Sequence, residues 1–187
     1  MARSGTADLG VVDGVPTVDS NASGYSNAST TIHYGFYRAA DNGSNLYING
    51  TTTYNAEDCT GTAIGTGTAN TQLLVNAMGA EAYFSEKGES KTGDYAAKLC
   101  DILTYTVNEV TYDDWFLPSK DELNLMYDNL KKAGLGGFAY VYPYEYWSSS
   151  EYDTNPIFAF VQQFNNGRKD TGANRSVDLR VRPVRAF

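Results

Sequence analysis

The chain has 187 residues, of which 42% are apolar and 19% are charged, and it contains 15 tyrosines. This length and apolar content suit one well-buried domain. The formal net charge of -8 argues against general binding to nucleic acid, because backbone binding needs a basic surface that displaces counterions. No apolar run approaches the roughly 20 residues that a membrane-spanning helix needs, so we expect no membrane insertion of this chain.

The N-terminal part of the chain predicts little regular structure. Residues 17–31 are rich in Ser, Asn, Thr and Gly, a composition typical of a linker or an irregular surface coil. We therefore expect a flexible or irregular segment over residues 1–30. The folded domain is expected over residues 31–187.

The next expected elements are two strands and a helix. Apolar and aromatic residues predict strands over residues 31–37 and 45–48, and the sequence DNGS at residues 41–44 predicts a turn between them. A helical composition predicts a helix over residues 71–78. This helix is expected to end at Gly79.

Residues 93–103 predict an amphipathic helix. Tyr95, Leu99 and Ile102 recur at helical spacing and would form one apolar stripe. Asp94, near the start, would interact favourably with the helix dipole. We expect the stripe to be buried.

The strongest helix signature begins at Ser119. Glu122 stands three residues later, which is the spacing of a capping box. Leu123, Met126 and Leu130 then recur at helical spacing, so we expect them to be buried.

The sequence DWFLPS at residues 114–119 combines aromatic and charged residues, which is one pattern of a ligand site. A structural role is favoured. Trp115, Phe116 and Leu117 are expected in the core, while Pro118 and Ser119 would start the helix.

The C-terminal part predicts an antiparallel sheet. Residues 159–164 and 177–184 have strand character, and the Asn-Asn-Gly sequence at residues 165–167 predicts a turn. Apolar and charged residues alternate in the last strand, so the two kinds would face opposite sides. Its charged residues are Asp178, Arg180 and Arg182.

The same region has the composition of a binding surface. It is dense in Asn, Gln, aromatic and small polar residues, which give adaptable hydrogen bonding and rigid contact area. Residues 168–187 contain six Lys and Arg against two Asp. An anionic ligand is therefore one alternative, and pairing of these arginines with carboxylates of the same chain is another.

Catalytic chemistry is not expected. The sole histidine, His33, lies far in sequence from the three serines that follow Trp147, so a Ser-His pair is disfavoured. Cys59 and Cys100 are too few for a disulfide scaffold and too far apart for a metal knuckle. They either pair with each other or are two buried thiols. No calcium-loop pattern is present, and we expect no metal and no cofactor.

Four motifs of this chain are distinctive enough to indicate a protein family. They are GDYAAKLC at residues 93–100, DWFLPSKDEL at 114–123, YWSSSEY at 146–152 and RVRPVRAF at 180–187. Over residues 55–187 the chain resembles a bacterial surface-protein family with the C-type lectin fold, in its sulfatase-modifying-factor branch. That family includes the variable proteins of diversity-generating retroelements. The resemblance implies an α+β fold in which two or three helices pack on a small twisted antiparallel sheet amid long irregular loops.

The resemblance also implies a site. In such retroelement systems, mutagenic copying rewrites adenine-containing codons near the 3′ end of the gene, and residues 153–179 stand where that variable region would lie. A solvent-exposed face would have Phe158 and Phe160 as aromatic anchors. Gln163 is excluded from the expected variable residues, because Gln does not arise by adenine substitution in an AAC or AAT codon. The expected ligand-binding residues are Asn155, Ile157, Phe158, Phe160, Asn165, Arg168, Asp170, Thr171, Gly172, Asn174, Ser176 and Asp178.

The resemblance implies a non-catalytic ligand-binding or display protein, located at the cell surface or secreted, with a lipid anchor as an option for the full-length form. The expected partner is a protein on another cell or host surface. One alternative is a carbohydrate-binding lectin-like module, in which exposed aromatic faces would stack on sugars. The other is a formylglycine-generating-type enzyme. Such enzymes depend on a reactive cysteine pair near the C-terminus, and this chain has no Cys after Cys100.

Overall fold

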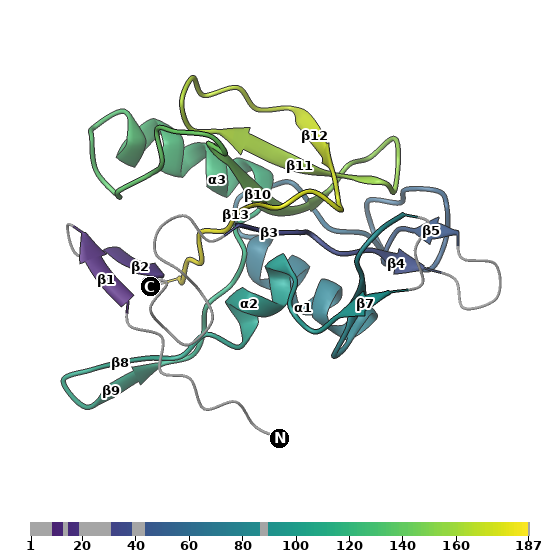
Figure 1. Cartoon of the computed structure of the whole chain (residues 1–187), viewed down its shortest axis with the longest axis horizontal. Coiled ribbons are helices and arrows are strands. Elements are labelled where there is room, and N and C mark those ends of the chain that lie inside the picture. Colours follow the sequence, from purple (N-terminus) through teal and green to yellow (C-terminus); the bar gives the residue numbers. More distant parts are fainter. Residues whose placement is uncertain (1–8, 13–14, 19–30, 39–43, 87–89, 187) are drawn as a thin grey trace.

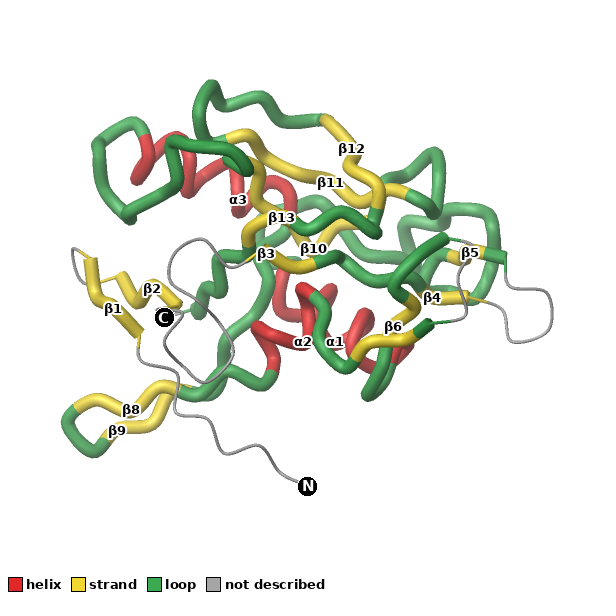
Figure 2. The backbone as a smooth tube through the Cα atoms, in the orientation of Figure 1, coloured by secondary structure: helices red, strands yellow, loops and turns green. Residues whose placement is uncertain are grey.

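The computed structural model describes residues 9–12, 15–18, 31–38, 44–86 and 90–186. Within these ranges the protein has the expected α+β character, with a mostly antiparallel sheet at its centre. The sheet lies between α3 on one side and α1 and α2 on the other (Figures 1 and 2). The helices are α1 Gly67–Met78, α2 Ala96–Asp101 and α3 Lys120–Met126, which continues into the π-helical turn η1 Tyr127–Lys131.

The central sheet has the strand order β12-β11-β10-β13-β3. Its pairs are antiparallel except β10 with β13, which run parallel. Its strands are β3 Thr31–Ile32, β10 Glu145–Glu151, β11 Phe158–Gln163, β12 Thr171–Asn174 and β13 Leu179–Arg180. Smaller antiparallel pairs are β1 Leu9–Val12 with β2 Val15–Val18, β4 Tyr37–Arg38 with β5 Asn45–Leu46, β6 Ala82–Tyr83 with β7 Lys91–Thr92, and β8 Tyr105–Val107 with β9 Val110–Tyr112.

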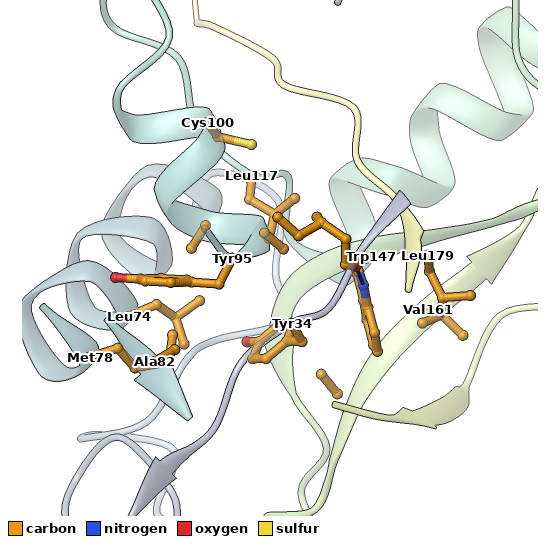
Figure 3. Packing of buried hydrophobic residues seen from close by; sticks show 14 residues of the cluster. Tyr34, Leu74, Met78, Ala82, Tyr95, Cys100, Leu117, Trp147, Val161 and Leu179 are labelled. Atoms are coloured by element: carbon orange, nitrogen blue, oxygen red, sulfur yellow. Dashed lines mark hydrogen bonds between the residues drawn. The ribbon is translucent and has the colours of Figure 1, made fainter. Parts of the chain in front are cut away.

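Alternation of side chains along the central strands produces two apolar layers. On one face, Trp147 and Val161 join the main core with residues of α1 and α2 such as Leu74 (Figure 3). On the other face, Tyr146 packs in a second cluster with Leu123 of α3. These two faces are called the Trp147 face and the Tyr146 face below.

The capping box predicted at Ser119 is confirmed. The Ser119 side chain accepts a hydrogen bond from the Glu122 backbone N–H, and the Glu122 carboxylate accepts one from the Ser119 N–H. Leu123 is buried as predicted, whereas Met126 and Leu130 are only partly buried against the same cluster. The helix becomes π-helical after Met126, so Leu130 does not keep the 3.6-residue spacing from which its burial was predicted.

The first helix is confirmed and ends at Gly79, but it begins at Gly67 rather than at residue 71. Its first turn was missed because the buried residue there is polar. Asn70 is buried, and its side chain bonds to the Gly61 backbone N–H and carbonyl and to the Ser149 hydroxyl. Apolar periodicity does not detect such a residue.

The helix predicted over residues 93–103 is shorter. Tyr95 has an extended backbone, and the helix runs only from Ala96 to Asp101. Tyr95 is fully buried as predicted and donates its hydroxyl to the Gly79 carbonyl. Ile102 was expected on the buried stripe, but it is 55% exposed because the helix ends before it.

The strand predicted over residues 31–37 is also corrected. It is divided into β3 and β4, and the N–H groups of Tyr34 and Gly35 both donate to the Arg175 carbonyl instead of a ladder. Gly35 has a φ of 91° and lies so close to Ala82 that a Cβ atom would not fit. The predicted strand over residues 45–48 exists as β5, paired with β4. Residues 41–43 of the predicted turn lie outside the described residues.

Two terminal regions differ from expectation. The irregular segment expected over residues 1–30 contains the β1–β2 pair, and the rest of it lies outside the described residues. The strand predicted over residues 177–184 is reduced to Leu179–Arg180. Beyond it, Val184 forms an isolated bridge with Phe116. This bridge helps to hold the 114–119 segment in the core, where Trp115, Phe116 and Leu117 are buried as predicted.

Candidate functional site

The β11–β12 hairpin forms the edge of the central sheet and contains most of the expected site. The predicted turn after β11 is confirmed: the Gly167 N–H donates to the Gln163 carbonyl at 2.8 Å. Gly167 has a φ of 80°, which favours glycine. The strand β12 was not predicted, because apolar and polar residues do not alternate clearly in Thr171–Asn174.

The hairpin register separates residues that were expected on one surface. Phe158 is opposite Asn174, and both lie on the Tyr146 face. Thr171 is opposite Val161 and therefore lies on the Trp147 face. A single continuous face containing Phe158, Thr171 and Asn174 is thus wrong, because residues an odd number of positions apart on one strand point to opposite sides.

Phe160 is not an exposed anchor, since only 6% of it is accessible. The Tyr152 ring lies 4.7 Å from the Phe160 ring centroid, and the Lys120 ammonium lies 4.5 Å from that centroid. The start of α3 therefore covers Phe160. Phe158, nearer the end of the strand, is partly buried beside Tyr152.

The other expected site residues lie in segments that flank the hairpin. Asn155 and Ile157 precede β11, and Ser176 and Asp178 follow β12. In the turn segment between the strands, the three expected site residues Asn165, Arg168 and Asp170 are all exposed. Asp170 pairs with Lys120, and the hydrogen bond from Lys120 holds the pKa of this carboxyl below its usual value.

An open pocket of about 300 Å³ lies on the Trp147 face of the same hairpin. It is bounded by residues of β10, β11, β12 and β13, of the segment between β12 and β13, and of the loop before β10. All of its lining residues except two belong to residues 153–179. The lining residues are Tyr142, Glu145, Val161, Gln163, Thr171, Gly172, Ala173, Val177 and Leu179.

Two oxygen atoms of the pocket residues are buried and have no hydrogen-bond partner among the described residues: Glu145 Oε2 and Thr171 Oγ1. The other carboxylate oxygen of Glu145 accepts a hydrogen bond from Gln163 Nε2 at 3.3 Å. A carboxylate accepts hydrogen bonds at both oxygens. The pocket therefore has unused capacity to accept hydrogen bonds beside an apolar wall.

The loop at the rim of the pocket exposes aromatic and apolar side chains. Tyr140 is 74% exposed, Val141 71% and Tyr142 77%. The Lys131 ammonium lies 3.2 Å from the Tyr140 ring centroid. Consecutive exposed residues of this kind are unusual in a surface loop and are typical of contact surfaces.

Of the nine residues that line the pocket, sequence analysis named only Thr171 and Gly172 as site residues, and it missed the other seven. One of the seven, Gln163, was excluded by a codon argument. The run of aromatic residues from Tyr140 to Tyr144 was an available signal. The position of Glu145 could not be predicted from the sequence, because it depends on the pairing of β10 with β11, where Glu145 is opposite Gln163.

The serine run after Trp147 has a structural role. All three serines are fully buried. Ser148 donates to the Phe160 carbonyl at 2.9 Å, Ser150 donates to the Gly61 carbonyl at 2.7 Å, and Ser149 accepts from Asn70. These hydroxyl groups tie the sheet to neighbouring loops. His33 is buried too, and its Nδ1 lies 3.5 Å from Asp178.

The C-terminal arginines are mostly internal. Arg180 and Arg182 were expected on a charged face, but each is 4% exposed. Arg180 donates to the Pro143 carbonyl, and the Arg182 guanidinium lies 4.5 Å from the Phe138 ring centroid. Arg185 pairs with Asp114. The predicted alternative of pairing within the chain therefore describes Arg185 and also Arg175, which pairs with Glu151.

Both cysteines are buried free thiols. This confirms the alternative of two buried thiols over a disulfide. Burial raises the pKa of Cys59, and it raises that of Cys100 well above its usual value. Neither thiol is thereby prepared to act as a nucleophile, which requires the thiolate form.

Over the described ranges, no three His, Cys, Asp or Glu side chains are grouped as a metal site. A search of the same ranges for a helix long and apolar enough to cross a membrane finds none. Comparison with protein-family models, curated proteins and solved structures gives no match for this chain.

Proposed function

We propose that this protein is a non-catalytic ligand-binding domain, with a C-type-lectin-like fold, that displays residues 153–179 as its binding region. The observation that carries the proposal is the pocket on the Trp147 face, whose lining comes mainly from that region. Ligand sites are concave and largely apolar, with a few polar groups that orient the ligand. The pocket has this composition.

The proposed partner is a protein presented on another cell or host surface, which places this domain at a cell surface or among secreted proteins. The exposed rim supports a protein partner. Tyr142 and its neighbours Tyr140 and Val141 add contact area around the pocket, and tyrosine is enriched among residues that dominate binding energy. The raised pKa values of Cys59 and Cys100 disfavour a cysteine nucleophile.

A selection from a random peptide library tests the proposal. Enriched peptides would be titrated against the protein by calorimetry. Val177 lines the pocket and is 41% exposed, so Val177→Trp should fill the pocket without disturbing the core and should abolish peptide binding. Val110, 51% exposed on the distant β8–β9 hairpin, provides the matched Val110→Trp control (Figure 1). Equal binding by the two variants would refute the assignment of this site.

Diversification by a retroelement is a separate part of the proposal. Sequencing of the DNA around the gene should find a reverse transcriptase gene and a near-copy of the 3′ coding segment. A neighbourhood without them would remove diversification and leave the binding role standing.

A carbohydrate-binding module is the second candidate, and the exposure of Tyr142 at the pocket rim favours it. Aromatic rings in such positions can stack on sugars. A glycan array tests it. Selective retention of a glycan by the unaltered protein that is lost in Val177→Trp would favour this candidate over a protein ligand. We expect no calcium-dependent retention, because the chain lacks a calcium-loop pattern.

A further inference from the structure

We propose that the pocket on the Trp147 face binds a cationic side chain, Lys or Arg, of a protein partner. This inference rests on the proposed ligand-binding role of the pocket and adds the chemical class of the bound group. It is carried by the combination of a carboxylate, a hydroxyl, an apolar wall and an exposed aromatic ring in one cavity.

The pocket residues contain two hydrogen-bond acceptor atoms that have no donor within the described ranges. Glu145 Oε2 and Thr171 Oγ1 are buried without a hydrogen-bond partner among the described residues. A buried acceptor without a donor costs about 1–3 kcal/mol, and more if it is charged. A donor that reaches either atom recovers part of this energy. The ammonium of Lys and the guanidinium of Arg carry several donors and no acceptor, which suits a site that offers acceptors.

The charge of the pocket also favours a cationic ligand group. Gln163 gives one neutral hydrogen bond to Glu145, and no ion pair of Glu145 is found within the described ranges. A cationic group would therefore complement the pocket carboxylate. The overall charge of -8 would also attract it at long range.

The remaining walls suit the rest of a long basic side chain. Val161, Val177 and Leu179 present apolar surface for the methylene stem, which Lys and Arg commonly bury while the charged end stays polar. Tyr142, a residue that is 77% exposed, can offer the face of its ring to a cation. Glu145 Oε2 and Thr171 Oγ1 have almost no accessible surface, so binding requires the Glu145 and Thr171 side chains to rotate toward the pocket.

Nuclear magnetic resonance titration of the full chain tests the inference. The probes are the N-acetyl methylamides of lysine, arginine and norleucine, together with a set of methyl glycosides. The lysine and arginine probes should shift the amide signals of Thr171, Gly172 and Ala173 in a saturable way, while norleucine, which has a similar stem without charge, should bind at least about tenfold more weakly.

Variants identify the acceptor. Glu145→Gln should weaken binding of the cationic probes at least about tenfold, and Thr171→Val, which keeps the side-chain shape, should weaken it by a smaller factor. Glu109→Gln on the β8–β9 hairpin is the matched control and should change nothing. Thermal melting of each variant checks that it is folded. Equal binding of norleucine and lysine, or unchanged affinity in both pocket variants, would overturn the inference.

The two proposals fail in different ways. If Val177→Trp abolishes binding of the selected peptides and Glu145→Gln does not, the ligand-binding role stands and the cationic side chain is refuted. If the methyl glycosides bind in the pocket and the cationic probes do not, the site belongs to a sugar.

Discussion

Arg175 and Glu151 form an ion pair with both side chains fully buried, and Arg175 Nη2 lies 2.9 Å from Glu151 Oε1. The same carboxylate oxygen accepts a hydrogen bond from the Ile48 N–H. Arg175 Nε donates to the Phe158 carbonyl. The pair therefore connects the end of β10, the start of β11 and the segment after β5, and it supports the hairpin that forms the pocket.

Replacing Arg175 by Met should lower the free energy of unfolding by about 3–5 kcal/mol, because it leaves the Glu151 carboxylate buried without its partner. Urea unfolding measures the change. The double variant with Glu151→Met should recover part of the loss, since both charges are then absent. As a control, Arg185→Met removes the exposed pair with Asp114 and should change the midpoint much less. A single variant as stable as the unaltered protein would show that the pair is dispensable.

Acid should destabilise the protein through His33. Burial holds the pKa of His33 below its usual value of 6.5, although Asp178 acts in the opposite direction. Between the folded and unfolded pKa values the unfolded chain binds more protons, so stability falls as the pH drops below about 6.5. Urea unfolding at pH 7.5, 6 and 5 should show this slope.

A His33→Gln variant should lose most of that slope, whatever its absolute stability. Asp114, Asp128 and Asp170 have lowered pKa values, so their contributions are present above the usual value of 3.8 and are lost at lower pH. They should not mask the effect of His33 above pH 5. A wild-type stability that is constant from pH 7.5 to 5 would contradict the prediction.

The two thiols should be free and unreactive in the native protein. Cys59 is 4% exposed, Cys100 is inaccessible, and burial raises both pKa values. A thiol reagent such as Ellman's should react slowly under native conditions. Two thiols should be detected in guanidinium without any reductant. Their absence there would mean that the cysteines are linked.

Gly167→Ala should destabilise the hairpin for two separable reasons. Its φ of 80° costs a non-glycine residue about 1–2 kcal/mol. The added methyl would also collide with the Tyr127 ring, and such overpacking costs about 1–3 kcal/mol more. Gly50 has the same φ and nothing within 4 Å of an added Cβ, so Gly50→Ala measures the backbone cost alone. Equal losses in the two variants would rule out the clash.

Some residues of the candidate site could be placed from sequence and others could not. The turn at Gly167 was predictable because Asn-Asn-Gly specifies a local backbone geometry. The burial of Phe160 was not, because its cover comes from Tyr152 and Lys120, outside its own strand. Glu145 reaches the pocket only through the register of β10 with β11.

By itself, the sequence determined the local features of this protein. The Ser119 capping box and the end of the first helix at Gly79 follow from interactions between residues close in the chain. The tertiary structure alone decided which side chains meet across the sheet. A one-residue shift in strand register moves a side chain to the opposite face, and burial of a charge such as Arg175 depends on a partner brought from 24 residues away. The hydrogen-bonding capacity of the pocket is therefore a property of strand pairing.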